Sequence, residues 1–303
     1  MNSRRQLFIL VLLMSILLVT PLVEAFPVTV TDSLGREVTV TKRPQRIISL
    51  APASTENLFR LGLADRIVGV TEFCNYPPEA AAKPKVGDFF TPSLEMVIVQ
   101  EPDLVVTAGG LHVTLQHIAR LEELGVPVYV YEPSSLEEVM SGIMNLGLIT
   151  DTVAAAEEIV AQMRREIAEV QSLVAAQREK PEVFVLIGIY EGFISSVGPN
   201  TFIGDVVEVA GGLNAARESI EEWPRYSFEV LLEKDPDVIL STTEYYPDGA
   251  TSVYELYGWD ALSAVRNKRV HQVSNLDAIN RGTYRTTGIL LEIAQVFYPG
   301  LVD

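Results

Sequence analysis

Ser93-Leu-Glu-Met-Val-Ile-Val-Gln-Glu-Pro-Asp-Leu-Val-Val106 is the stretch that decides the fold, because its pattern occurs twice in the chain. The second copy is Ser227-Phe-Glu-Val-Leu-Leu-Glu-Lys-Asp-Pro-Asp-Val-Ile-Leu240, and it aligns with the first without a gap at an offset of 134 residues (229 − 95). In each copy, apolar residues at i, i+3 and i+4 predict a short helix, and a Pro-Asp pair before an apolar run predicts a turn and a buried strand. The offset is too long for a solenoid repeat, so we expect two similar α/β lobes.

The length and charge of the chain agree with a two-lobed protein that binds neither nucleic acid nor an anionic membrane surface. A chain of 303 residues can bury two ordinary hydrophobic cores. The formal net charge is −17, and the acidic residues are spread along the sequence. Such a charge repels polyanionic partners. Cys74 is the only cysteine, which excludes an intramolecular disulfide and a cysteine zinc cluster, and we interpret it as a small buried residue.

Residues 1–25 have the composition of a secretory signal peptide. Arg4-Arg5 gives a basic start, an apolar run follows at 7–19, and Ala25 offers a small-residue cleavage site. We therefore expect a mature chain that begins at Phe26 and an extracytoplasmic location, either periplasmic or on the outer face of the cytoplasmic membrane. The alternative is a retained anchor, but Pro21 keeps the apolar run shorter than the roughly 20 residues that a membrane span needs.

The mature chain alternates predicted strands and helices on both sides of one long helical segment. A hairpin at 28–40 is followed by predicted strands at 46–51, 67–71, 104–108 and 126–131, with helices at 52–61, 93–100 and 114–124. This alternation predicts a parallel sheet with helices on both faces, in an N-terminal lobe at 26–150. The predicted elements of a C-terminal lobe at 181–303 are a strand at 182–188, a hairpin at 189–198, a helix at 204–210, the repeated helix and strand, a strand at 269–273 and a helix at 286–297.

The segment 151–180 is predicted to be a single helix that joins the lobes. It contains neither Gly nor Pro, Asp151 is a good N-cap residue, and Pro181 supplies a stop. Thirty residues would make a helix roughly 45 Å long, which is too long for a crossover within one compact lobe. We interpret it as a rigid connection, the alternative being an ordinary long surface helix.

The chain lacks the short motifs that usually mark enzymes of this architecture. No glycine-rich dinucleotide loop, phosphate loop, nucleophile elbow or His-Glu-x-x-His motif occurs. His112 and His271 could meet Asp277 as a metal site, but they lack paired ligand spacing. We therefore expect a protein that is not an enzyme and holds no metal or cofactor, with a chelatase-like enzyme and a metal-ion carrier as alternatives.

Aromatic residues gather in the loops expected at the carboxyl ends of the strands, where open α/β sheets bind ligands. Rings that face one another across a cleft would hold a large flat ligand. Trp223 lies in a Gly/Glu/Pro-rich loop where a core role is not expected, and Asp277 and Arg281 add an acid and a guanidinium after the last strand, although this pair also fits a surface ion pair. The aromatic set is Phe73, Tyr76, Phe89, Phe90, Tyr190, Phe193, Trp223, Tyr226, Tyr245 and Tyr246.

Glu95 and Glu229 occupy the same position in the first helical turn of the two repeated segments. An acid at a helix N-terminus is favoured by the helix dipole, worth roughly 0.3 to 1 kcal/mol. That explanation and a functional role for the pair both remain open at this point.

The mature chain resembles the class III substrate-binding proteins of ABC importers, most closely the periplasmic cobalamin-binding proteins. The motifs that carry the resemblance are Asp32-Ser-Leu-Gly-Arg36, Ile47-Ile-Ser-Leu-Ala-Pro-Ala-Ser-Thr-Glu56, Val68-Gly-Val-Thr-Glu-Phe-Cys-Asn-Tyr-Pro-Pro78, the Ser93-Leu-Glu95 and Pro102-Asp103 pair, and Trp223-Pro-Arg-Tyr-Ser-Phe-Glu229. The chain departs from the family pattern at Phe89, where the family has Trp, and at Phe73, where a Tyr can occur.

The resemblance implies two Rossmann-like lobes with central parallel sheets, joined by one long helix, and a small-molecule ligand held between them. It implies that Glu95 and Glu229 dock the protein, as a monomer, on an ABC permease dimer with its ATPase subunits. The ligand would be a corrinoid such as vitamin B12, or alternatively a ferric siderophore or haem, in which case Arg281 and Arg285 would face an anionic ligand. The residues implied for ligand binding are Phe73, Tyr76, Phe89, Trp223, Asp277 and Arg281.

Overall fold

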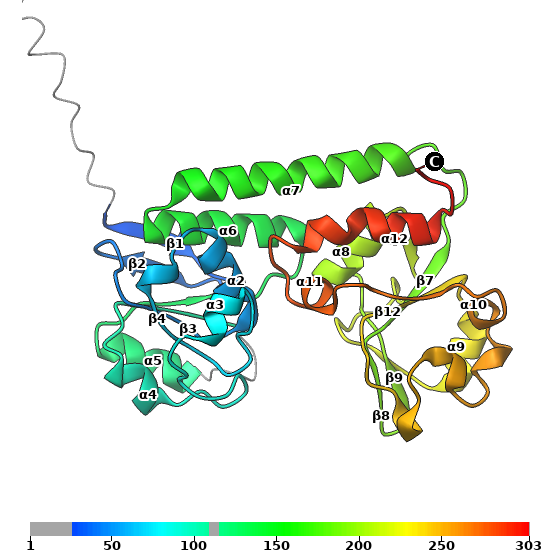
Figure 1. Ribbon diagram of the computed structural model, residues 1–303, viewed down its shortest axis with the longest axis horizontal. Helices are drawn as coiled ribbons and strands as arrows, with labels where there is room; N and C mark the ends of the chain where they lie inside the picture. The colour runs from blue at the N-terminus through cyan, green and yellow to red at the C-terminus, as the bar shows by residue number, and fades with distance from the viewer. Residues whose placement is uncertain (1–25, 109–114, 303) are drawn as a thin grey trace, which may run out of the picture.

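The computed structural model describes residues 26–108 and 115–302. The predicted leader at 1–25 and the candidate ligand His112 therefore lie outside the described residues. Within the described ranges, no helix combines the length and the apolar character needed to cross a membrane. Two α/β lobes lie side by side, and a layer of long helices runs along one side of both (Figure 1).

The N-terminal lobe is built on the predicted parallel sheet, with strand order β4-β3-β5-β6. Runs of Val, Ile and Leu form its short strands, which are buried on both faces, as in parallel sheets covered by helices. The strands are β3 (Ile47–Ser49), β4 (Ile67–Val70), β5 (Leu104–Thr107) and β6 (Val128–Val130). Helices α2 (Pro52–Arg60), α3 (Pro78–Ala81), α4 (Leu94–Val99) and α5 (Leu115–Glu123) accompany the sheet, and β1 (Val28–Thr31) and β2 (Glu37–Val40) form the predicted antiparallel hairpin.

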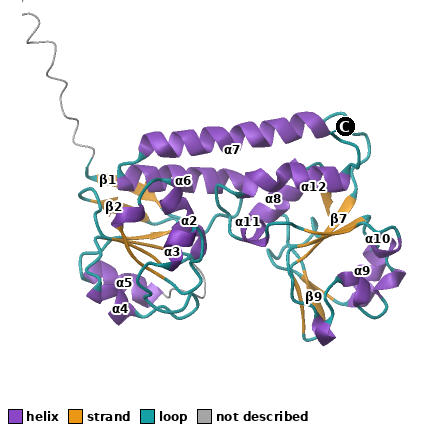
Figure 2. Ribbon diagram, in the orientation of Figure 1, coloured by secondary structure: helices purple, strands orange, loops and turns teal. Residues whose placement is uncertain are grey.

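The C-terminal lobe contains a second four-stranded parallel sheet, with order β10-β7-β12-β13. Its strands are β7 (Glu182–Leu186), β10 (Leu213–Asn214), β12 (Val238–Ser241) and β13 (Val270–Gln272). A separate antiparallel sheet of β8 (Gly188–Tyr190), β9 (Phe193–Ser195) and β11 (Arg225–Tyr226) extends the lobe away from the helical layer (Figure 2). The helices of this lobe are α8 (Phe202–Val209), α9 (Phe228–Lys234), α10 (Ser263–Arg266), α11 (Leu276–Asn280) and α12 (Leu290–Phe297).

The repeated segment adopts the same structure in both lobes. Ser93 and Ser227 are the N-caps of α4 and α9, and each side chain accepts a hydrogen bond from the backbone N–H three residues later. The shared aspartates have a structural role: the Asp103 carboxylate accepts from the N–H groups of Gln45 and Arg46, just before β3, and Asp237 accepts from Glu182 at the start of β7. Each aspartate thus fixes the entry of the neighbouring strand, which explains why both copies keep it.

One long helix joins the lobes, as predicted, but a second helix that was not predicted comes directly before it in the helical layer. Helix α6 (Leu136–Thr150), which the sequence analysis did not predict, begins at Ser135, whose hydroxyl accepts from the Glu138 N–H. It ends at Asp151 in a left-handed conformation (φ 58°), with the Thr152 N–H donating to the Gly147 carbonyl. Asp151 therefore closes α6 instead of capping the next helix.

Helix α7 (Val153–Val174) is the long joining helix, and it is shorter than the predicted 151–180. Its 22 residues span roughly 33 Å. Its last buried residue is Val170, and residues 175–180 are all exposed. Since helices in proteins depend on packing of an apolar face, the helix ends where that face ends. Figure 1 shows α7 running past both lobes, with α6 beneath it on one side and α12 on the other.

One hydrophobic core continues from the N-terminal hairpin through the helical layer into the C-terminal lobe. It includes Val30, Ile143, Ile159, Val206 and Leu290, all at most 6% exposed. Two smaller clusters complete the outer parts of the two lobes. The lobes are therefore joined by packed side chains and not by a flexible linker.

Candidate ligand-binding cleft

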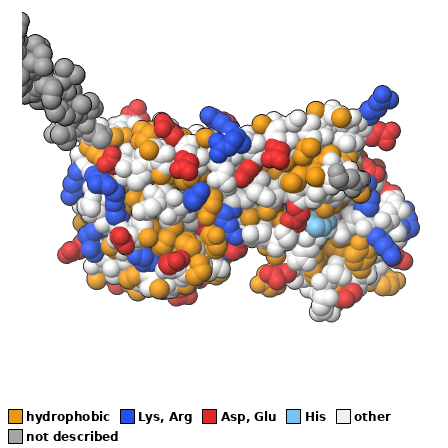
Figure 3. All heavy atoms as spheres, turned by 45° about the horizontal axis from the view of Figure 1, so that its top comes forward, with side chains coloured by type: hydrophobic (Ala, Val, Ile, Leu, Met, Phe, Trp, Pro, Cys, Tyr) orange, Lys and Arg blue, Asp and Glu red, His pale blue; other side chains and the backbone are white. Residues whose placement is uncertain are grey.

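The surface is hollowed between the two lobes on the side away from α7 (Figure 3). The floor of this cleft is formed where the segment 275–287 of the C-terminal lobe meets α2 and the loop after β4 of the N-terminal lobe. The two lobes approach each other closely at Gly282, whose carbonyl accepts a hydrogen bond from the Tyr131 hydroxyl at 2.7 Å. A side chain at Gly282 would meet Pro133 at 3.2 Å, and its φ of +54° also favours glycine.

Glu56 lies at the centre of this floor. Pro52 begins α2, and the helix turns its Ser54–Leu58 stretch inward, so the side chain of Glu56 is fully buried. Its two carboxylate oxygens accept from two arginines of the other lobe, Arg281 at 2.7 Å and Arg285 at 3.0 Å. The hydroxyl of Thr283 donates to Glu56 at 3.4 Å. A buried carboxylate thus ties the two lobes together.

Arg281 and Asp277, both implied by the resemblance, take part in the same network. They lie four residues apart on and just after α11, and the Arg281 guanidinium donates to Asp277 at 2.7 Å and to Asn75 of the N-terminal lobe at 2.9 Å. The side chain of Arg281 is 15% exposed. The pair is therefore not an isolated surface ion pair, because the arginine reaches the buried Glu56.

Tyr76 lies over this network and not with the other rings of its loop. The Arg285 guanidinium stacks on the Tyr76 ring at 3.8 Å from the ring centre and also donates to Asn275 at 3.2 Å. Tyr284 lies beside Tyr76, and burial, followed by the effects of Tyr76, raises the pKa of Tyr284 to about 12. Both phenols therefore belong to the interlobe floor.

Three phenylalanines of the loop after β4 form an aromatic cluster on the N-terminal lobe. Phe73 lies 6.3 Å from Phe89 and 5.8 Å from Phe90, and the last two lie 5.1 Å apart, measured between ring centres. Phe73 is 47% exposed and Phe90 is 56% exposed, although both are large apolar side chains. The structure brings Phe73 and Phe89 together as an accessible apolar surface and adds Phe90 to them.

Trp223 is the corresponding exposed ring of the C-terminal lobe. It is 47% exposed, and its loop is held against the strand β9 by the N–H groups of Ser196 and Gly198, which donate to Pro224 and Glu222. Of the remaining candidate rings, Tyr190, Phe193 and Tyr245 are exposed. Tyr226 and Tyr246 instead pack against the second core cluster.

Of the alternative metal site, only His271 and Asp277 lie within the described residues, and the ion-pair partner of His271 there is Glu292. His271 lies 2.7 Å from Glu292, whose carboxylate also accepts from Ser274. Burial opposes ionisation of Glu292, but the bonds from Ser274 and His271 outweigh it and lower the pKa of Glu292. Among residues 26–108 and 115–302, no group of three His, Cys, Asp or Glu residues is arranged to hold a metal ion.

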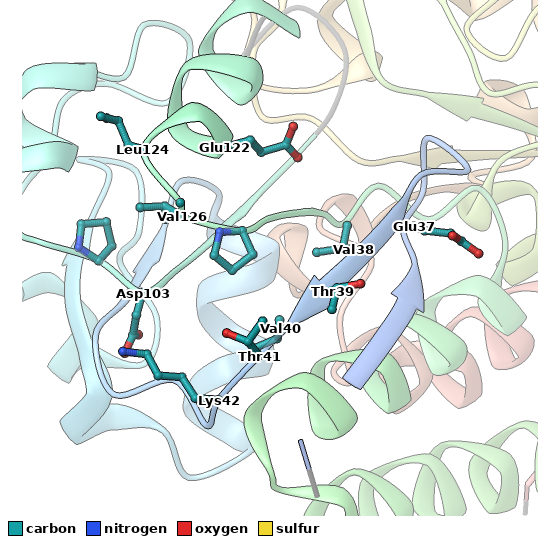
Figure 4. Close-up of a pocket in the computed structure, with 13 residues that line it drawn as sticks. Glu37, Val38, Thr39, Val40, Thr41, Lys42, Asp103, Glu122, Leu124 and Val126 are labelled. Atoms are coloured by element: carbon teal, nitrogen blue, oxygen red, sulfur yellow. The ribbon is translucent and has the colours of Figure 1, made fainter. Parts of the chain in front are cut away.

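A cavity of about 430 Å³ on the N-terminal lobe lies apart from this cleft. It is lined by β2 on one side and by the residues that precede β5 and β6 on the other (Figure 4). The cavity therefore lies at the amino ends of these strands, whereas ligands of open α/β sheets bind at the carboxyl ends. We do not assign the ligand to this cavity.

Glu95 and Glu229 are both exposed, in the first turns of α4 and α9. A hydrogen bond from Ser227, followed by one from its own backbone N–H, lowers the pKa of Glu229. In Figure 1, α4 lies at the bottom of the N-terminal lobe and α9 lies on the outer side of the C-terminal lobe, both away from α7. The two glutamates thus occupy equivalent positions of the repeated segment, one in each lobe.

Comparisons with known proteins identify a family for the chain. The family model described as periplasmic binding protein matches residues 47–275. An uncharacterized ABC transporter substrate-binding lipoprotein of Bacillus subtilis, YvrC, is 31% identical over 91% of this chain and 87% of its own length. The cobalamin-binding protein of Halobacterium salinarum is 30% identical over 84% of this chain and 69% of its own length.

Solved structures with the same fold bind more than one ligand. The periplasmic vitamin B12-binding protein BtuF of Vibrio cholerae superposes with a TM-score of 0.73 at 26% identity, covering 86% of this chain and 99% of that one. The periplasmic heme-binding protein RhuT of Roseiflexus sp. RS-1 gives a TM-score of 0.72 at 26% identity, covering 85% and 99%. The two lobes, their parallel sheets and the joining helix are those of the class III fold.

Proposed function

The chain belongs to the periplasmic binding protein family, and we propose that it is the substrate-binding component of an ABC importer that carries a corrinoid, without converting it chemically. In this proposal the leader at 1–25 directs export, the lobes at 26–150 and 181–303 enclose the ligand, and the segment 151–180 joins them.

The observation that supports the proposal is a set of large aromatic rings left accessible on both lobes. Phe73 and Phe90 expose about half of their surface, and Trp223 exposes a similar share on the other lobe. Accessible aromatic surface of this kind usually marks an interaction site. A corrinoid is large enough to cover rings on both lobes and can contact them through its apolar edges and faces.

The polar floor supports the same assignment. Asp277, Arg281 and Tyr76 lie together between the lobes, so that they can contact the edge of a bound ligand while the rings hold its faces. We propose Phe73, Tyr76, Phe89, Trp223, Asp277 and Arg281 as ligand-binding residues, and we add Phe90.

Haem is the second candidate ligand. The similarity to the heme-binding protein of Roseiflexus is as strong as the similarity to the vitamin B12-binding protein of Vibrio cholerae, so the fold does not separate the two ligands. A flat tetrapyrrole would use the same rings.

We propose that Glu95 and Glu229 dock the loaded protein, as a monomer, on the permease dimer with its ATPase subunits. The two carboxylates are exposed and come from equivalent positions in the two lobes. Exposed apolar residues adjoin them, with Met96 and Val99 beside Glu95 and Val230 beside Glu229. An acid that served only as a partner of its own helix dipole would not need this apolar surround.

Isothermal titration of the purified mature protein with cyanocobalamin tests the ligand assignment. We expect one binding site per chain with micromolar or tighter affinity, accompanied by a change in Trp223 fluorescence. An absence of both heat and fluorescence change at micromolar protein would remove the corrinoid from the proposal. A titration with hemin under the same conditions tests the second candidate.

A further inference from the structure

We propose that Glu56 sets the charge preference of the cleft, because it neutralises the arginines of the floor and thereby favours ligands without anionic groups. This inference rests on the proposed function of the cleft and deepens it by naming the chemical class of its ligand. Glu56 acts here as a specificity-determining residue that works through Arg281 and Arg285.

Both arginines already have a carboxylate partner and an amide partner. Arg281 donates to Glu56, Asn75 and Asp277 at 2.7 to 2.9 Å. Arg285 donates to Glu56 and to Asn275, and the Tyr76 ring covers one face of its guanidinium at 3.8 Å. An anionic ligand would therefore meet guanidinium groups whose positive charge is already paired with a carboxylate.

The charges of this cluster also cancel. Glu56 and Asp277 supply two carboxylates, and Arg281 and Arg285 supply two guanidinium groups. The arginine side chains are 15% exposed whereas Glu56 is fully buried, so the carboxylate that compensates them lies behind them, out of reach of a ligand. Lys85 lies in the loop after β4 that carries the three phenylalanines, and its ammonium group donates to the carbonyls of Thr71 and Cys74.

The consequence differs between neutral and anionic ligands. A ligand carboxylate placed in this cleft would lose water and gain little attraction from a neutral cluster, and loss of hydration without a partner is costly. A ligand whose edge carries amides needs no excess positive charge and can use the exposed rims of Asp277 and Arg281. The cluster therefore favours a corrinoid with amide side chains over a tetrapyrrole with free propionates.

Replacing Glu56 by glutamine tests the inference, because E56Q keeps the shape of the side chain and leaves one excess positive charge. The probes are hemin and its dimethyl ester, which share one ring system and differ in the charge of the propionates, together with cyanocobalamin. In the wild-type protein we expect hemin to bind no more tightly than the ester. In E56Q, the affinity for hemin should rise on the order of 10- to 100-fold relative to the ester. Cyanocobalamin measures any general disturbance of the cleft in E56Q, and the ratio between hemin and its ester separates such a disturbance from a change in charge preference.

Two further variants separate charge from loosening of the lobes. The double variant E56Q/R285Q restores neutrality, and the gain for hemin should disappear in it. D205N alters another contact between the lobes, in which Asp205 accepts from the Leu136 N–H at 2.8 Å, and it should leave the preference between hemin and the ester unchanged. Circular dichroism confirms that each variant is folded.

The outcomes distinguish this inference from the proposed function. Wild-type protein that binds hemin more than tenfold tighter than the ester, or a folded E56Q in which the ratio does not move, would overturn the role of Glu56. Wild-type protein that fails to bind cyanocobalamin would overturn the corrinoid assignment, while the ratio between hemin and its ester would still report on Glu56.

Discussion

Replacing Phe73 by alanine should weaken cyanocobalamin binding by about 10- to 50-fold. Phe73 is 47% exposed, and a Phe side chain has about 200 Å² of surface, so about 95 Å² is open to a ligand. At about 25 cal/mol per Å², full coverage of this area contributes about 2.4 kcal/mol, or about 50-fold in Kd. Coverage of half of the area gives about 1.2 kcal/mol, which sets the lower end of the range.

Isothermal titration of F73A with cyanocobalamin measures this change, and the melting temperature shows whether the variant remains folded. The matched control is Tyr257→Ala, since Tyr257 is a fully exposed ring outside the aromatic cluster, and its removal should leave Kd unchanged. Because Phe73 also contacts Phe89 and Phe90, the losses in F73A and F90A should not add. A folded F73A that binds as tightly as the control would refute the assignment of the cluster to the ligand.

Three further predictions follow from the structure. E95R and E229R should each reduce cyanocobalamin uptake by cells and leave the Kd of the purified protein unchanged. If uptake is undiminished, the docking role is wrong and the helix dipole alone explains both glutamates. Burial is the largest effect on Asp205 and raises its pKa above the ordinary value of an aspartate. The contribution of this carboxyl group to stability is therefore present below the ordinary pKa and is lost as the pH rises through the raised pKa. Urea unfolding across this pH range should show the wild type losing stability relative to D205N, and parallel curves would contradict the prediction. D151G should raise the free energy of unfolding by about 0.5 to 1 kcal/mol, because Asp151 closes α6 at a φ of 58° that glycine adopts without strain and its ion pair with Arg43 is exposed; a lower melting temperature would be the opposite result.

The parallel sheets could be predicted from the sequence because their strands are short apolar runs bounded by clear turn signals. The repeated segment shows this best, because the short helices, the Pro-Asp turns and the buried strands all lie where the pattern predicts them. Local signals of this kind depend only on residues close in the sequence. Because the segment occurs twice, each copy supports the structure predicted for the other.

The helical layer was predicted less well, because α6 ends at Asp151 and α7 begins directly after it. Asp151 is a good N-cap by type, yet its backbone is left-handed and it ends α6. The Ser135 and Glu138 pair is a capping signal that would have revealed α6. The end of α7 at Val174 depends on where the apolar surface beneath it stops, and a sequence does not show that surface.

The candidate site was predicted in its aromatic part and only partly in its polar part. Exposed rings in strand-end loops can be expected from their types and positions, as with Phe73 and Trp223. The pairing of Glu56 with Arg281 and Arg285 joins residues 225 and 229 positions apart, so no spacing in the sequence shows it. This pairing depends on how the segment 275–287 of the C-terminal lobe packs against α2 of the N-terminal lobe.

The continuous core has a consequence for how the chain folds. Helix α12 packs on α7, and residues from α12 and from the N-terminal hairpin belong to the same buried cluster. The part of the apolar face of α7 that α12 covers therefore stays open until α12 has packed on it. We expect the two lobes, although duplicated in sequence, to melt in one cooperative transition, and a chain that lacks α12 to remain open to proteases along α7.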